Sequence, residues 1–177
     1  VDCAGPGASL DVTTPEEDLH MRDLQLIGAP ASNFVWTVRL ACTEKGVPYS
    51  LVPAPPHTPE VDAIHPFGKI PVMRHGDFTL AESRAICLYI DRTFDGPPLV
   101  PADVQAAAKV EQWLSIANTK IDQLLVRRYL GAWFFPSTSD GSPDRQVIDA
   151  ALPELRAHFA VLDAAPLDDD QALRALG

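Results

Sequence analysis

Basic residues and long hydrophobic runs are scarce in this sequence of 177 residues. Fourteen Lys and Arg face 24 Asp and Glu, a formal net charge of -10, which argues against binding driven by neutralisation of nucleic-acid phosphates or anionic lipid. No run approaches the roughly 20 residues of a membrane helix, and the start of the chain lacks the pattern of a secretory signal. We therefore expect a cytoplasmic protein with neither nucleic acid nor a membrane as partner.

Cysteine is also scarce, and metal ligands do not cluster at recognised spacings. The three cysteines, Cys3, Cys42 and Cys87, are odd in number and far apart, and two of them fall in hydrophobic periodic segments, so we expect reduced thiols. Three histidines share one stretch: His57, His65 and His75. Their spacings match neither a helix face nor the usual zinc-finger patterns, so we predict no bound metal.

Glycine patterns that cradle a phosphate or present a nucleophilic serine are missing as well. Gly68-Lys69 resembles the end of a phosphate-binding loop, but no glycine stands five residues earlier, and Ile70 occupies the place of the required hydroxyl residue. The chain contains no Gly-x-Ser-x-Gly sequence. Neither motif is therefore supported.

The acidic excess lies at the two ends of the chain. Residues 1–20 contain five acidic side chains and no Lys or Arg, whereas residues 21–162 contain 13 basic and 15 acidic side chains. Residues 1–20 are also punctuated by Gly and Pro without periodicity, which predicts a disordered extension. His20-Met21 is either a cloning junction or the native start. The net charge therefore says little about the ligand of the remaining chain.

Residues 21–95 alternate between strand and helix signals and predict an α/β domain. Short hydrophobic runs predict strands over 24–27, 49–52, 70–73 and 78–80, the last two joined by a tight turn at 75–77. Helical spacing predicts a helix that ends at Lys45-Gly46, a brief helix around 60–64 and another helix over 82–94. The proline-rich stretch 53–59 cannot join a β-ladder and is expected to form a surface loop.

From residue 102 onward the sequence carries helix signals only. Hydrophobic spacing predicts one long amphipathic helix over 102–130. Ser142-Pro143 predicts the start of a second helix with Ser142 as its N-cap, and the acidic run 168–170 predicts the start of a short terminal helix. Residues 96–101 are therefore predicted to link the domain of residues 21–95 to an all-helical domain of residues 102–177.

Four local features of the α/β domain point to one chemistry, and two of them concern the backbone. Ser32 lies between the first strand and the first helix, where its hydroxyl and the adjacent N–H groups would stabilise a thiolate. Ile70-Pro71 enters a strand, and a cis bond there would direct the backbone groups of Ile70 outward, toward a peptide-like ligand.

The other two features concern charge. Glu82-Ser83 opens the next helix, where Ser83 is suited to a carboxylate and Glu82 to an ammonium group. His57 and Lys69 would supply local positive charge. Together the four features describe a site for a charged, thiol-bearing peptide.

These stretches resemble the glutathione S-transferase superfamily, nearest to its serine-type branches such as phi. The resemblance covers about residues 24–162 and implies an α/β plus all-α fold, in which a thioredoxin-like N-terminal domain precedes a helical-bundle domain, shortened here. It also implies glutathione as cosubstrate, a homodimer and no metal. Four segments in the family's order carry it: Leu26-Ile27-Gly28-Ala29-Pro30-Ala31-Ser32, Glu44-Lys45-Gly46-Val47-Pro48-Tyr49, His65-Pro66-Phe67-Gly68-Lys69-Ile70-Pro71-Val72 and Leu80-Ala81-Glu82-Ser83-Arg84-Ala85-Ile86.

The resemblance implies a role for each candidate residue. Ser32 stands where serine-type members keep the hydroxyl that activates glutathione. Ile70, before a cis Pro71, pairs with the cysteinyl unit, and Glu82 with Ser83 binds the γ-glutamyl group. The candidates for positive charge beside the tripeptide are Lys69 and His57, of which His57 matches the glycyl-carboxylate position only loosely.

The implied reaction joins the glutathione thiolate to a small electrophilic, apolar substrate, as in detoxification. One hydroxyl hydrogen bond and a helix N-terminus would lower the pKa of a thiol from ~9 by about two units. The residues expected to line the hydrophobic substrate pocket are Phe34, Trp113, Tyr129 and Trp133, with Trp36 and Phe134 as further candidates.

Structural roles remain open for the same residues. Ser32 also fits the N-cap position of its helix, and Thr79 with Glu82 has the spacing of a capping box. Lys69 and His57 also fit ordinary surface positions. Most aromatic residues of the helical domain are expected to belong to its core.

Two other functions also remain open. The helical domain is short, and no Ser or Thr follows Ser142, so the capping box that begins a central helix in the family is missing. A non-catalytic module of this fold would bind glutathione without turnover and serve a protein partner or small apolar ligands. A glutathione-dependent peroxidase or reductase is the second alternative, although the nearest cysteine, Cys42, lies ten residues after Ser32.

Overall fold

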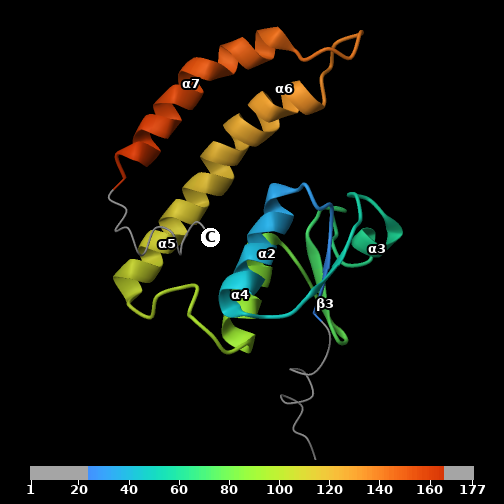
Figure 1. Ribbon diagram of the computed structural model, residues 1–177, viewed down its shortest axis with the longest axis vertical. Helices are drawn as coiled ribbons and strands as arrows, with labels where there is room; N and C mark the ends of the chain where they lie inside the picture. The colour runs from blue at the N-terminus through green and yellow to red at the C-terminus, as the bar shows by residue number, and fades with distance from the viewer. Residues whose placement is uncertain (1–23, 166–177) are drawn as a thin grey trace, which may run out of the picture. The chain divides into compact units, whose positions relative to one another are not determined.

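The computed structural model describes residues 24–165, which form two compact units, residues 24–99 and residues 100–165 (Figure 1). The predicted extension over residues 1–20 and the predicted terminal helix after residue 167 lie outside the described residues. Among residues 24–165, no helix combines the length and hydrophobicity that crossing a membrane requires.

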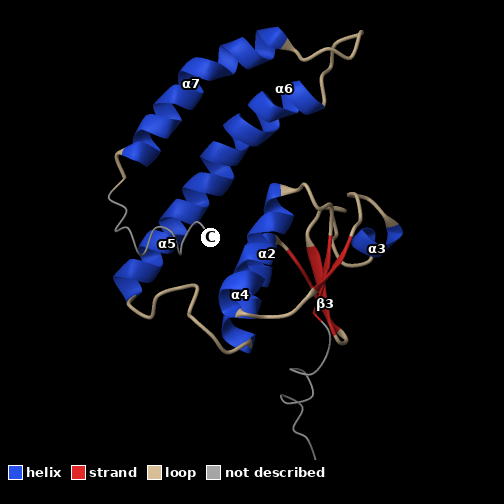
Figure 2. Ribbon diagram, viewed as in Figure 1, coloured by secondary structure: helices blue, strands red, loops and turns tan. Residues whose placement is uncertain are grey.

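The first unit is built on a mixed four-stranded sheet (Figure 2). Strands β1 (Leu24–Ile27), β2 (Ser50–Val52), β3 (Val72–His75) and β4 (Phe78–Ala81) lie in the order β2-β1-β3-β4. β1 and β2 are parallel, and β3 runs antiparallel to both β1 and β4. The predicted thioredoxin-like α/β fold is confirmed.

Helices cover both faces of this sheet. Helices α2 (Asn33–Lys45) and α4 (Ser83–Thr93) pack together on one face, and the short α3 (Pro59–Asp62) lies on the other. Strand residues alternate between the two faces: Leu26 and Met73 belong to the core beneath α2 and α4, whereas Ile27 and Val72 pack with Val61 of α3. Hydrophobic residues on both faces therefore hold the sheet between two layers of helix.

The hairpin between β3 and β4 differs by one or two residues from its prediction. β3 begins at Val72 rather than at residue 70, because Pro71 has no N–H to donate to the ladder. His75 belongs to β3, not to the turn, since it pairs with Phe78 and its buried ring bonds the Tyr89 hydroxyl at 2.9 Å. The turn consists of Gly76-Asp77 alone.

A buried ion pair joins the ends of α2 and α4. The ammonium of Lys45 lies 3.3 Å from Asp91 Oδ1, and the two side chains are 3% and 11% exposed. Asp91 Oδ1 also accepts the N–H of Leu99 at 2.8 Å. Lys45 was predicted as a basic residue in the last turn of α2. It also binds Asp91 of α4, which in turn accepts the N–H of Leu99 at the end of the first unit.

The second unit consists of a long helix followed by an antiparallel partner. α5 (Val104–Ile116), η1 (Ala117–Leu130) and α6 (Gly131–Phe134) continue without a break, so the predicted helix extends four residues beyond 130. η1 is π-helical, and at its end the N–H of Gly131 donates to the carbonyl of Val126, five residues back.

The second helix, α7 (Arg145–Asp163), starts later than predicted. Its N-cap is Asp144, whose carboxylate accepts the N–H of Val147 at 3.2 Å, and not Ser142. Ser142 instead donates its hydroxyl and its N–H to Asp140 in the preceding turn. A carboxylate is a good N-cap because it is charged opposite to the helix N-terminus. α7 packs on η1 around Leu124, Ala151 and Leu155, and the predicted helical domain is confirmed.

Replacing Asp91 by Asn keeps the shape of the side chain and removes the charge that faces the buried Lys45 ammonium. A buried charge that loses its counterion is strongly destabilising, so we expect the free energy of unfolding to fall by about 3 kcal/mol. Urea denaturation measures this loss, with Glu44→Gln on the exposed surface of α2 as control. A loss no larger than that of the control would contradict the role of the ion pair.

Candidate functional site

The register of the sheet brings four chain segments to one edge. Ile27 at the end of β1 lies opposite both Val52 at the end of β2 and Val72 at the start of β3, and Val72 lies opposite Ala81 at the end of β4. The segments that leave or enter the sheet at these residues therefore meet at the same edge. They contain the candidates Ser32, His57, Lys69, Ile70, Pro71, Glu82 and Ser83.

Ser32 is the N-cap of α2 by backbone conformation, but its hydroxyl does not cap the helix. Its φ and ψ are −72° and 127°, its carbonyl accepts the N–H of Trp36 at 2.9 Å, and its side chain makes no capping hydrogen bond. The first turn of α2 contains no acidic residue. The capping interpretation of the Ser32 hydroxyl is therefore wrong, and the hydroxyl stands at a helix N-terminus that attracts anions.

The Ile70-Pro71 peptide bond is cis, as predicted. Ile70 takes part in no backbone hydrogen bond with any other residue of the range 24–165. The loop after β1 lies against it, since a Cβ built on Gly28 would stand 3.3 Å from the Cβ of Ile70. An extended segment with unused backbone groups thus lies beside the loop that leads to Ser32.

Glu82 is the N-cap of α4 and has a left-handed backbone, with φ 73° and ψ 116°. Its carbonyl accepts the N–H of Ile86 at 3.0 Å, its side chain makes no capping bond, and that side chain is 73% exposed. The capping-box interpretation is wrong, because Thr79 lies within β4 and Glu82 is not at the third helical position. Such a φ costs a non-glycine residue about 1–3 kcal/mol, and strain of this kind concentrates at functional sites.

His65 joins this site, although the sequence pointed to it only as a possible metal ligand. Its side chain is 4% exposed, and its Nε2 lies 3.2 Å from Glu82 Oε1. Its Nδ1 accepts the N–H of Phe67 at 3.0 Å. The one feature of the sequence that indicated a role for His65 at this site was its place in the segment that contains Lys69, Ile70 and Pro71.

His57 and Lys69 differ in their surroundings. His57 has a φ of 60°, and its exposed ring faces Asp62, with Nδ1 and Oδ1 3.7 Å apart. Its N–H donates to the carbonyl of Gly68 at 2.9 Å, which closes the loop. Lys69 is exposed and has no ion-pair partner among residues 24–165. Of these two residues, Lys69 is therefore the one whose positive charge remains available for a ligand.

The aromatic residues predicted to line the substrate pocket come from both units. Phe34 lies on α2, whereas Trp113 is on α5, Tyr129 on η1 and Trp133 on α6. Tyr129 packs against the core of the second unit, and Trp133 lies beneath the guanidinium of Arg145, whose Cζ is 5.1 Å from the ring centroid. Their joint role in a substrate pocket stays a prediction.

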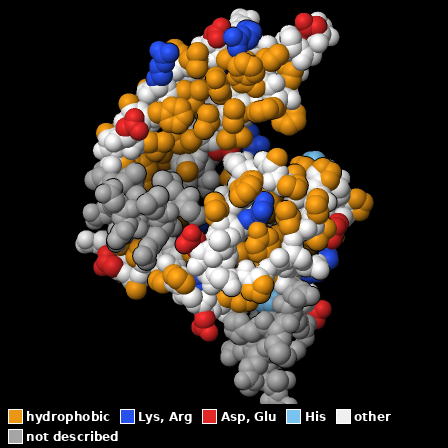
Figure 3. Space-filling model, viewed as in Figure 1, with side chains coloured by type: hydrophobic (Ala, Val, Ile, Leu, Met, Phe, Trp, Pro, Cys, Tyr) orange, Lys and Arg blue, Asp and Glu red, His pale blue; other side chains and the backbone are white. Residues whose placement is uncertain are grey.

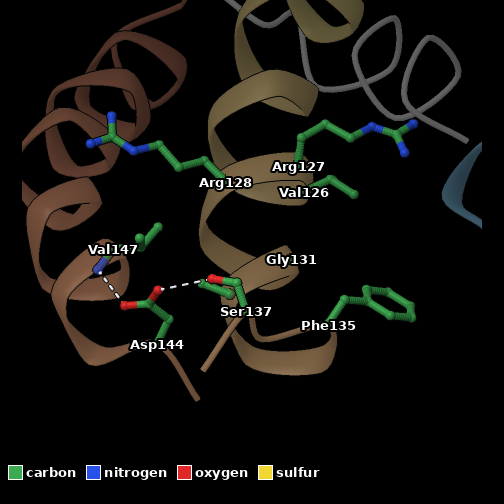
Figure 4. Close-up of a pocket in the computed structure, with 9 residues that line it drawn as sticks. Val126, Arg127, Arg128, Gly131, Phe135, Ser137, Asp144 and Val147 are labelled. Carbon is green, nitrogen blue, oxygen red and sulfur yellow. Dashed lines mark hydrogen bonds between the residues drawn. The ribbon is translucent and has the colours of Figure 1, made fainter. Parts of the chain in front are cut away.

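A cavity of about 500 Å³ opens in the second unit among η1, α6 and the start of α7 (Figure 4). Its charged groups are already paired: Arg127 with Asp122 at 3.0 Å, and Arg128 with Glu154 at 3.5 Å. Asp144, which also lines it, caps α7. The cavity contains none of the aromatic residues predicted for the substrate pocket.

The second unit also exposes many hydrophobic side chains, which Figure 3 shows gathered over α6 and α7. Phe134 is 72% exposed and Phe135 is 86% exposed, and α5 has no buried residue. Two helices bury only the faces that they turn toward each other, so their remaining hydrophobic faces stay open.

The cysteines of the first unit are unsuited to redox catalysis. Cys42 and Cys87 are free thiols, as predicted, while Cys3 lies outside the described residues. Burial raises the pKa of Cys42 to about 12 and the pKa of Cys87 to about 11. Since the thiolate is the reactive form, a raised pKa lowers the reactivity of both thiols near neutral pH. Within residues 24–165, no group of three or more His, Cys, Asp or Glu could hold a metal ion.

Comparison with known proteins relates both units to one family. The family model "Glutathione S-transferase, N-terminal domain" matches residues 26–98. Glutathione S-transferase 3 of Zea mays is 35% identical over 159 residues, which cover 81% of this chain and 67% of that protein. Glutathione S-transferase F10 of Arabidopsis thaliana is 38% identical over 129 residues, which cover 68% of this chain and 59% of that protein.

A solved structure gives the same relationship at the level of the fold. The crystal structure of glutathione transferase F7 from Populus trichocarpa matches with a TM-score of 0.70 at 29% identity, over 80% of this chain and 70% of that chain. The matched part thus spans 59% to 70% of the lengths of these three relatives.

Gly68 is required by the loop that carries Lys69 and Ile70. Its φ is 61°, and an added Cβ would overlap the ring of His57 and the carboxylate of Asp62. Gly46 has a similar φ of 69°, with nothing within 4 Å of an added Cβ, so it is a matched control.

We expect Gly46→Ala to lower the free energy of unfolding by about 1 kcal/mol, the cost of the backbone conformation. Gly68→Ala should lower it by about 2–3 kcal/mol, because the His57 ring must also move. Urea denaturation compares the two variants. Adding His57→Ala to Gly68→Ala should reduce the loss toward that of the control, whereas equal losses in the two single variants would show that the overlap is unimportant.

Proposed function

The chain belongs to the glutathione S-transferase family, and we propose that it joins the thiol of glutathione to a small electrophilic, apolar substrate. The observation that carries the proposal is the shared sheet edge. There the start of α2 with Ser32, the cis Ile70-Pro71 segment and the start of α4 with Glu82 emerge together. A helix N-terminus, unused peptide groups and a carboxylate are the partners that a thiolate, a peptide backbone and an ammonium group require.

The tripeptide would bind first through its backbone. The unused N–H and C=O groups of Ile70 support antiparallel pairing with the cysteinyl unit, as in peptides that add a strand to a sheet edge. The exposed carboxylate of Glu82 suits the ammonium of the γ-glutamyl group, and Ser83 at the first turn of α4 suits its carboxylate.

For the glycyl carboxylate we propose Lys69 in preference to His57. Lys69 directly precedes Ile70 and has no acidic partner among residues 24–165. The ring of His57 faces Asp62, whose charge opposes the binding of a second carboxylate.

In the proposed reaction Ser32 stabilises the thiolate and the protein supplies no general base. The Ser32 hydroxyl donates a hydrogen bond to the sulfur, and the N-terminus of α2 adds positive potential, so the thiol proton leaves to water. The sulfur then uses its electron pair to form a bond to the electrophilic carbon. The leaving group departs with the electrons of the bond that breaks.

We propose Phe34, Trp113 and Trp133 as pocket residues, together with Tyr129 despite its packing against the core of the second unit. A homodimer and a cytoplasmic location belong to the same proposal, on the basis of family membership and the sequence analysis. The raised pKa values of the Cys42 and Cys87 thiols give no support to a reductase.

Binding to immobilised glutathione, followed by elution with free glutathione, tests the proposed glutathione site. Conjugation of glutathione to an aromatic halide tests the reaction. Binding with turnover supports the transferase, and binding without turnover favours the non-catalytic alternative. Failure of the folded protein to bind glutathione would overturn the proposal.

Ser32→Ala removes the hydroxyl and leaves the helix N-terminus in place. We expect the pKa of the bound thiol to rise, which lowers kcat near pH 7 by roughly 10- to 100-fold and moves the rise of kcat with pH to higher pH. Ultraviolet titration of bound glutathione and a pH series of kcat measure both effects, and Ser50→Ala, an exposed serine of β2, is the control. Unchanged kinetics would remove Ser32 from the reaction.

A further inference from the structure

We propose that His65 is a positioning residue of the glutathione site, whose ring holds the Glu82 carboxylate in the orientation that binds an ammonium group. The inference rests on the proposed function, in which Glu82 contacts the γ-glutamyl unit. It adds a residue that touches no part of the ligand and acts through Glu82.

One hydrogen bond of the His65 ring indicates which ring nitrogen carries the proton. Nδ1 accepts the N–H of Phe67 at 3.0 Å, so this nitrogen offers a lone pair. The proton of the neutral ring is therefore on Nε2, which lies 3.2 Å from Glu82 Oε1. Nε2 therefore faces the carboxylate at ion-pair distance, and the backbone on the other side of the ring fixes the orientation of the ring.

Burial distinguishes the two partners of this contact. The side chain of His65 is 4% exposed, whereas that of Glu82 is 73% exposed. A glutamate in water samples several rotamers, and ordering it on binding would cost entropy. A buried donor that already holds Oε1 removes part of that cost and leaves Oε2 for the ligand.

The same ring connects two of the segments that form the site. The backbone N–H of His65 donates to Val61 of α3 at 2.8 Å, and its carbonyl accepts the N–H of Gly68 at 2.9 Å, so His65 is anchored in the loop that leads to Ile70. Glu82 belongs to the start of α4 and has the unfavourable φ of 73°. Surrounding contacts must hold a residue in such a conformation, and the His65 contact is one of them.

Substitution of His65 by Asn or by Gln tests the ring's contact with Phe67 separately from its contact with Glu82. In His65→Asn the amide oxygen lies close to the position of Nδ1 and keeps the bond from Phe67, but the side chain is too short to reach Glu82. In His65→Gln the amide nitrogen lies close to the position of Nε2 and keeps a donor for Glu82. The two variants are therefore matched in chemistry and differ in the contact that they preserve.

We expect His65→Asn to raise the Kd and the KM of glutathione roughly three- to tenfold, with kcat at saturating glutathione changed by less than about twofold. His65→Gln should stay close to the wild type. Calorimetry and steady-state kinetics measure these values. An unchanged Kd in His65→Asn, or an equal rise in both variants, would overturn the proposal.

A double-mutant cycle shows whether the effect passes through Glu82. Glu82→Ala should raise the Kd by itself, and adding His65→Asn to it should cause no further rise. A full additional increase would mean that the ring acts independently of Glu82, and would overturn the positioning role. A purely structural role would lower the stability of both His65 variants without this dependence on Glu82.

Nuclear magnetic resonance of the histidine nitrogens keeps the test decisive if His65→Asn does not fold. The full chain should show His65 with a protonated Nε2 and an unprotonated Nδ1, and Glu82→Ala, a change at an exposed side chain, should shift the Nε2–H signal. The opposite tautomer, or an unaffected signal, would overturn the proposal.

Glutathione binding by the wild type distinguishes a failure of this inference from a failure of the proposed function. If the wild type does not bind glutathione, the proposed function and this inference both fail. If the wild type binds and His65→Asn binds equally well, only the role of His65 fails.

Discussion

The pairing of Val72 with both Ile27 and Ala81 determines where the polar groups of the candidate site lie. Because β3 runs antiparallel to both neighbours, the end of β1, the start of β3 and the end of β4 come to the same edge. A slip of one residue would turn Val72 and Met73 to the opposite faces and empty both cores. The hydrophobic alternation that stabilises the sheet therefore also fixes the places at which the segments of the site emerge.

Several polar groups at this edge make few or no hydrogen bonds within the fold. The Ser32 hydroxyl makes no capping bond, Ile70 makes no backbone hydrogen bond among residues 24–165, and the Glu82 carboxylate is mostly exposed. Buried polar groups of a folded chain are usually satisfied within it. The Ser32 hydroxyl, the backbone of Ile70 and the second oxygen of the Glu82 carboxylate are therefore suited to the ligand that we propose. His65 differs from these groups, since it is buried and both of its ring nitrogens are engaged.

Most of the fold followed from local patterns in the sequence. Short hydrophobic runs predicted the four strands, and the helical spacing with Lys45-Gly46 predicted the last residue of α2. The remainder depended on long-range contacts that a local pattern does not contain. Asp144 rather than Ser142 caps α7, and Lys45 pairs with Asp91, 46 residues away. The contact of His65 was not predicted for the same reason, because its partner Glu82 lies on another element.

The two units differ in how completely they bury their hydrophobic residues. The first unit encloses a core on each face of its sheet and carries every residue proposed to contact glutathione. The second unit buries one seam around Leu124, Ala151 and Leu155, while α5 buries no residue at all. In the proposed function, affinity for glutathione therefore depends on the first unit. Conjugation also needs an apolar substrate to be held against the thiolate, and three of the four proposed pocket residues belong to the less enclosed unit.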